Sequence, residues 1–169
     1  MTSVPSHPAV AAATARLAAL DQQFQPVALI EHGDGAAAVL LESRDFRVIV
    51  IVEHRDDEWI TPSMVSGTPR PVSRSRPART LDHRPLLRMS RTRVAHPDPD
   101  GQPAQTSWSA VLGTAAADAT TLTVISTIDS YTAPIAPNGL AFALVRTRTG
   151  EHPLINVHTA DGRIVPVVP

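Results

Sequence analysis

Apolar residues at spacings of three and four predict a helix over residues 8–23. Pro8 suits the first helical position, where its missing N–H costs nothing, and Pro26 closes the segment. The apolar positions form one narrow stripe made of Val10, Ala13, Leu17, Leu20 and Phe24. We expect this stripe to pack on a sheet, although the same pattern would also suit contact with a partner helix.

Four short apolar runs follow the helix and are separated by turn-forming residues. They cover residues 27–31, 37–42, 46–53 and 58–65. Runs of this length and spacing are typical of an antiparallel meander. In the third run both alternating sets of positions are apolar, with Val48, Val50 and Val52 on one set and Ile49 and Ile51 on the other. This pattern predicts a central strand that is covered on both faces.

Strand-like alternation returns from residue 107. Leu122, Val124 and Ile128 share one parity, while Thr121, Thr123 and Thr127 share the other. Asn138-Gly139 and Asp161-Gly162 are hairpin turn signals. Further strands are expected over residues 140–146, 154–159 and 163–168. The fold class predicted is therefore mainly β with an N-terminal helix (α+β), an antiparallel meander followed by a sandwich-like C-terminal half.

Between these two halves the chain is rich in proline. Eight of the sixteen prolines lie within residues 62–103, and proline lacks the N–H that a strand ladder needs. We expect little regular sheet there, apart from one short element near residues 86–94. The chain is accordingly divided into residues 1–65, a Pro/Arg-rich excursion or linker over 66–105, and residues 106–169, which can share one core with 1–65.

The C-terminal third, about residues 108–166, carries the successive stretches "TTLTV", "YTAPIAPNGLAFALV" and "LINVHTADGRIV". Their turns and hydrophobic alternation resemble small immunoglobulin-like β-sandwich domains of actinobacterial proteins. The resemblance implies a sandwich fold and a binding or scaffolding role. It carries over no functional residues, because those domains share no catalytic motif.

The composition excludes several kinds of chemistry. The chain has no Cys and no Lys, so disulfides, thiolate zinc sites, thiol nucleophiles and Schiff-base lysines are excluded. No nucleophile-elbow, P-loop, zincin or dinucleotide-binding motif is present. The stretch "HPDPDG" at residues 96–101 begins like a calcium loop but lacks the later ligands, so it is read as a turn. We therefore expect no catalytic residues, cofactor or metal, and lean against an enzyme.

The chain shows no sequence signal for a membrane span or a secretory leader. The longest strongly apolar run, residues 48–52, is far short of the roughly 20 residues that a spanning helix needs. The Ala-rich start lacks a basic segment and carries Arg16 in its middle. A cytoplasmic protein is expected.

Arginine is concentrated in one segment. Residues 70–93 hold eight arginines and one acid, Asp82, for a net charge of +7, while residues 21–58 hold nine acids and three arginines, for a net charge of −6. The arginines are Arg70, Arg74, Arg76, Arg79, Arg84, Arg88, Arg91 and Arg93. Such asymmetry points to an anionic contact. The segment could dock on the chain's own acidic meander or be an inert linker, bind an acidic partner protein, or bind nucleic acid.

These observations rank three functions. The leading hypothesis is a non-catalytic interaction or accessory module that binds a protein or another macromolecule, with a protein partner or self-association expected. The alternative is nucleic-acid binding through residues 70–93, which the absence of interleaved aromatic residues disfavours. The third is a small-ligand or enzymatic pocket between the helix and the meander.

Overall fold

A computed structural model gives the structure of the chain and describes residues 4–20, 22–33, 35–62, 64–71, 75–95 and 100–168. The chain divides into two compact units, Met1–Val72 (unit 1) and Ser73–Pro169 (unit 2). Strands dominate both units, and the helix lies in unit 1. The predicted fold class, mainly β with an N-terminal helix, is confirmed.

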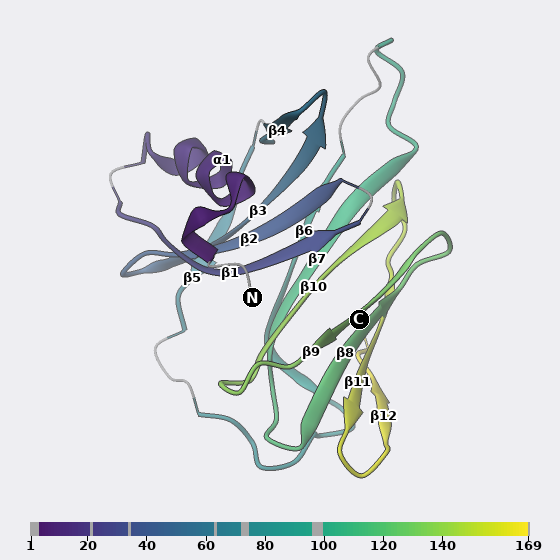
Figure 1. Cartoon of the computed structure of the whole chain (residues 1–169). Coiled ribbons are helices and arrows are strands. Elements are labelled where there is room, and N and C mark those ends of the chain that lie inside the picture. Colours follow the sequence, from purple (N-terminus) through teal and green to yellow (C-terminus); the bar gives the residue numbers. More distant parts are fainter. Residues whose placement is uncertain are drawn as a thin grey trace. The chain divides into compact units, whose positions relative to one another are not determined.

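Unit 1 is a helix on an antiparallel sheet (Figure 1). The sheet order is β1-β2-β3-β4, and β5 pairs with the other end of β3. Its elements are η1 (Val4–Ser6), α1 (Pro8–Leu17), β1 (Gln25–His32), β2 (Ala36–Glu42), β3 (Phe46–Arg55), β4 (Glu58–Ile60) and β5 (Gly67–Pro69). The predicted antiparallel meander corresponds to β1 to β4, which are joined in sequence order.

Helix α1 is shorter than the predicted 8–23. It begins at Pro8, where His7 caps it by accepting a hydrogen bond from the Ala9 N–H on Nδ1 at 3.1 Å. After Leu17 the backbone N–H of Leu20 bonds back three residues to the Leu17 carbonyl, which tightens the chain into a turn. Leu20 therefore leaves the buried stripe and is 53% exposed.

Strand β3 is central, as predicted. It pairs with β2 on one side and with β4 and β5 on the other. Val48, Val50 and Val52 pack with the buried face of α1 in one cluster, and Ile49 and Ile51 are buried as well. Both parities of this strand are therefore covered.

Unit 2 is a sandwich of two antiparallel sheets. One has the order β10-β7-β6 and the other β12-β11-β8-β9. Apolar side chains from both sheets, including Val111 and Val145 from the first and Leu122, Val124 and Ile155 from the second, share one core. The strands are β6 (Leu86–Val94), β7 (Thr106–Ala115), β8 (Ala119–Ile125), β9 (Ser130–Pro134), β10 (Leu140–Arg148), β11 (Leu154–Thr159) and β12 (Ile164–Pro166).

The proline-rich segment contains more sheet than its composition predicts. Strand β6 has the bounds expected for the one short element, and β5 also lies in this segment. Both strands lie at sheet edges, where a missing backbone donor is tolerated. Strand β6 itself contains no proline, since Pro85 precedes it and the next proline is Pro97. The boundary between the units falls within this segment, at Val72 and Ser73.

The assignment of Ile128 to the inner face of a strand is wrong. Strand β8 ends at Ile125, and residues 126–129 form a turn in which the Ser126 N–H bonds to the Asp129 carbonyl at 2.8 Å. Ile128 is consequently exposed. The described part of the chain holds no helix long and apolar enough to cross a membrane.

Candidate functional site

The arginines of segment 70–93 are divided between the two units. In unit 1, Arg70 Nε lies 3.1 Å from Glu42 Oε2, and its Nη1 donates to the Ser43 carbonyl at 3.3 Å. Glu42 is buried, and its Oε1 also accepts a hydrogen bond from Arg47 Nε at 2.8 Å. Arg70 thus contacts an acid of the meander, as the internal docking hypothesis expects, and helps to neutralise a buried carboxylate.

Arg76 is used inside unit 2. Its guanidinium donates to three backbone carbonyls, those of Ala115 at 3.0 Å, Pro137 at 2.7 Å and Ala116 at 2.8 Å. Gly139 lies directly against the same side chain. Arg76 therefore ties the end of β7 to the turn before β10, and its charge is directed at protein acceptors.

The remaining arginines do not converge. Arg93 donates through Nη2 to the Glu151 carbonyl. Arg91 faces the same side of β6, and its Nε is buried without a hydrogen-bond partner in the described part of the chain. Arg84 and Arg88 are exposed, Arg79 joins the cluster described next, and Arg74 lies outside the described residues.

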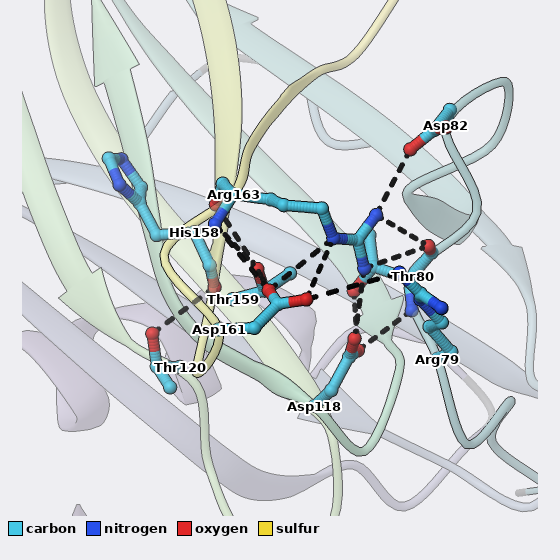
Figure 2. A network of polar contacts seen from close by, with 9 residues as sticks. All are labelled: Arg79, Thr80, Asp82, Asp118, Thr120, His158, Thr159, Asp161 and Arg163. Carbon is cyan, nitrogen blue, oxygen red and sulfur yellow. Dashed lines mark hydrogen bonds and ion pairs between the residues drawn. The ribbon is translucent and has the colours of Figure 1, made fainter.

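A cluster of polar side chains in unit 2 surrounds Arg163 (Figure 2). Its centre is Arg163, on the turn between β11 and β12, whose guanidinium reaches three carboxylates: Asp161 at 3.1 Å, Asp82 at 3.1 Å and Asp118 at 3.2 Å. Arg79 adds a longer contact of 4.0 Å to Asp161. These residues come from three separate stretches of unit 2: residues 79–82, Asp118, and the turn at 161–163.

Thr80 connects this cluster to the preceding segment. Its backbone N–H and its hydroxyl both donate to Asp118 Oδ1 at 2.7 Å, and its carbonyl accepts from Arg163. Thr80 is only 3% exposed, so these bonds replace water that the residue has lost. The donors and acceptors of the cluster are directed at one another, so the cluster holds Thr80, Asp118 and Arg163 together and has a structural role.

The cluster also shifts the pKa values of two of its members, Asp161 and Arg163. The Thr159 hydroxyl, and then Arg163, hold the pKa of Asp161 below its ordinary value, and Asp161 in turn raises the pKa of Arg163. A carboxyl with a lowered folded-state pKa stabilises the fold above its unfolded pKa. This contribution is lost as the pH falls below about 4, through the folded-state pKa.

We expect Asp118→Ala to destabilise the protein by roughly 1–3 kcal/mol, because it leaves the buried N–H and hydroxyl of Thr80 without an acceptor. Chemical denaturation monitored by circular dichroism measures this loss. Asp82→Ala is the matched control: it removes a carboxylate from the same guanidinium, but its side chain is 86% exposed. An equal loss in both variants would contradict the structural role given to Thr80 and Asp118.

Unit 1 has an apolar groove of about 350 Å³ beside the end of α1. Leu20 and Phe46 are exposed at its rim, at 53% and 40%. Gln22 is fixed there because its Oε1 accepts a hydrogen bond from the Ser43 hydroxyl at 2.8 Å. The groove is lined by Leu17, Leu20, Gln22, Phe24, Phe46, Val48, Val65 and Gly67.

Gly67 shapes one wall of this groove. A Cβ at this position would lie 3.0 Å from Val48 Cγ2 and 3.2 Å from the Arg47 carbonyl oxygen. A side chain here would require Val48 or the Arg47 carbonyl to move by a few tenths of an ångström, so glycine favours the close approach of β5 to β3. The groove is thus a built part of unit 1, between the segment after α1 and the β3–β5 pair.

A second hollow of unit 1, of about 510 Å³, surrounds Trp59. Trp59 pairs with His54 across the β3–β4 hairpin, and their ring centroids are 5.0 Å apart. His7 approaches the same indole edge-on at 5.6 Å. The lining residues are Glu31, His32, Gly33, Gly35, His54 and Trp59. Within the described ranges no group of three or more His, Asp or Glu residues is placed to hold a metal ion.

A scan against protein-family models, a search of curated proteins and a search of solved structures gave no match to this chain.

The sequence allowed a pocket between the helix and the meander, but it did not indicate which residues line the apolar groove or the hollow around Trp59. Leu20 lay at helical spacing and was assigned to the buried stripe, and Phe46 was assigned to a covered strand. Phe46 is the first residue of its strand, and this terminal position was the available signal that its side chain is exposed. Nothing local could bring Thr80, Asp118 and Arg163 together, since they lie up to 83 positions apart.

Proposed function

We propose that the protein is a non-catalytic interaction module that binds a partner protein, and that the groove beside α1 receives an apolar side chain of that partner. The observation that carries the proposal is the pair of large apolar side chains, Leu20 and Phe46, exposed on a groove whose lining is apolar apart from Gln22. Interfaces draw most of their affinity from a few large side chains that fill such depressions.

The polar surroundings of the groove are compatible with this role. The oxygen of Gln22 is held by Ser43, and its amide nitrogen makes no hydrogen bond among the described residues. That amide can donate to the backbone carbonyl of a bound segment and fix its orientation. The resemblance of residues 108–166 to immunoglobulin-like domains, which implies a binding or scaffolding role, supports the same class of function.

Nucleic-acid binding through residues 70–93 is supported less well. Arg70, Arg76 and Arg93 already donate to acceptors of the protein. Phosphate oxygens would have to compete with those bonds. A partner that fills the apolar groove requires no such exchange.

The groove can be tested with side-chain surrogates. We expect N-acetyl-leucinamide and N-acetyl-tryptophanamide to shift backbone amide resonances of residues 17–24, 46–48 and 65–67 saturably in two-dimensional NMR. Leu20→Gln should weaken this binding about tenfold, because it removes apolar surface from the rim. Leu154→Gln is the matched control, since Leu154 is also exposed but lies on β11 of unit 2.

A small-ligand role for the same groove would appear as binding of 1-octanol without binding of either amide. That result would overturn the proposal of a protein partner. Absence of saturable shifts with all three compounds, or equal weakening by the two Leu variants, would overturn the groove as a site altogether.

A further inference from the structure

The hollow around Trp59 combines an indole ring with a carboxylate. Glu31 Oε1 lies 3.4 Å from His7 Nε2, and the Glu31 side chain remains 59% exposed. His7 in turn meets the edge of the Trp59 ring. One imidazole therefore holds Glu31 and Trp59 in the same place, at the start of α1.

The hydrogen bond that His7 accepts from the start of α1 bears on the charge of this site. His7 Nδ1 accepts from the Ala9 N–H and so cannot carry a proton while it caps α1. The proton of the neutral ring is then on Nε2, which points at Glu31. A neutral imidazole does not compensate the negative charge of Glu31, so the hollow has a carboxylate beside an indole.

Two glycines leave room next to this charge. An added Cβ at Gly33 would meet nothing within 4 Å, so the wall there is open. Gly35 has a φ of +82°, which favours glycine, and its carbonyl accepts the His54 N–H at 2.7 Å. Gly35 is thus hydrogen-bonded to the backbone of His54, and Gly33 borders free space.

We propose that this hollow is a binding site for an organic cation, a guanidinium or an alkylated ammonium group. The face of an indole attracts cations through its quadrupole, and tryptophan is the best of the aromatic residues for this purpose. Glu31 supplies the matching negative charge, and His54 supplies a second ring wall. The site uses different residues from the apolar groove, so either proposal can fail without the other.

Two sources could supply such a cation: a small quaternary ammonium compound, or the side chain of an arginine in a peptide. Choline and N-acetyl-argininamide serve as the respective probes, and the indole N–H resonance of Trp59 is the readout. The second indole, that of Trp108, belongs to β7 in unit 2 and provides an internal reference. We expect saturable shifts of Trp59 with at least one probe and none of Trp108.

Charge and shape are tested separately. 3,3-Dimethylbutan-1-ol has the shape of choline without its charge, and N-acetyl-citrullinamide is the neutral counterpart of the arginine probe. Each neutral compound should bind at least about tenfold more weakly than its cation. Choline binding alone would assign the site to a small ammonium ligand, and arginine binding alone to a basic peptide. Either outcome supports a cation site.

Glu31→Gln tests the carboxylate, because it removes the charge and keeps an acceptor for His7. The variant should bind the cation about tenfold more weakly. Glu58→Gln is the matched control, since Glu58 is exposed next to Trp59 in the chain but does not line the hollow. Gly33→Ile should abolish binding by filling the open wall, without touching the core.

Three results with the probes and the Glu variants would overturn the proposal. They are an absence of saturable shifts with both cations, equal binding of a cation and its neutral counterpart, and equal weakening by the Glu31 and Glu58 variants. A correctly folded Gly33→Ile variant that still binds the cation would also overturn it.

Discussion

Replacing Val50 by Asp is expected to unfold unit 1. Val50 has no exposed surface, pairs with Val39 of β2 and packs in the cluster that α1 covers. An aspartate there would place an unpaired carboxylate in an apolar interior, where it has no hydrogen-bond donor. The expected loss exceeds about 4 kcal/mol, which is comparable to the whole stability of many domains. Thermal unfolding and the yield of soluble protein measure it.

The control for this change is Thr123→Asp in unit 2. Thr123 is partly exposed on the outer face of β8, where its hydroxyl lies 3.0 Å from both the Thr132 hydroxyl and His158 Nε2. A carboxylate at this position remains hydrated and next to an imidazole, so the loss should stay below about 1 kcal/mol. Equal losses in the two variants would mean that the inner and outer faces are wrongly assigned.

The second large effect is expected from Gly139→Ala. Gly139 has a φ of +87°, and an added Cβ would lie 2.7 Å from Arg76 Cδ and 3.0 Å from the Ala115 carbonyl oxygen. The Arg76 guanidinium would have to leave its three carbonyl acceptors. Backbone strain of about 1–2 kcal/mol and the lost charged hydrogen bonds, about 1.5–3 kcal/mol each, make a loss of 3 kcal/mol or more the expected result on urea denaturation.

Gly150→Ala separates the two causes. Gly150 has nearly the same φ, +84°, but nothing lies within 4 Å of an added Cβ. This variant should lose only the strain of about 1–2 kcal/mol. In an Arg76→Ala background, Gly139→Ala should then cost less than in the wild type, because only the strain and the 3.0 Å contact with the Ala115 carbonyl oxygen remain. Failure of the Arg76 background to reduce the cost would show that the guanidinium is not the cause.

Local patterns predicted the strands well, because the buried face of each strand appears as an alternation of apolar residues within that strand. The two-sided apolar pattern of β3 identified a central strand, and the proline-free stretch at 86–94 identified β6 with its bounds. The end of α1 was predicted less well. Leu20 fits the helical spacing, and the turn that displaces it is fixed by contacts such as the Gln22–Ser43 bond, which spans 21 positions.

The candidate sites could not be predicted in the same way. The arginine segment was treated as one basic surface, but nearby arginines have different roles. Arg76 turns toward backbone carbonyls, while Arg79, three residues later, is largely exposed beside Asp161. The charge of a segment does not show in which direction each arginine side chain points, because the backbone of this segment changes direction at its prolines. The Trp59 hollow depends on Glu31 of β1, His54 of β3 and Trp59 of β4, which sheet register brings together, and on His7, which the start of α1 positions.

The sheet orders described above have a consequence for how the chain folds. In unit 1, β1 to β4 pair with their neighbours in sequence, so each pairing closes only a short loop. In unit 2, β7 pairs with β10 and β8 with β11, so each pairing must wait for strands made later. Loop closure makes such non-local pairings slower, and amino-terminal regions leave the ribosome first. We therefore expect the half that carries both hollows to acquire its structure early, while the sandwich is still incomplete.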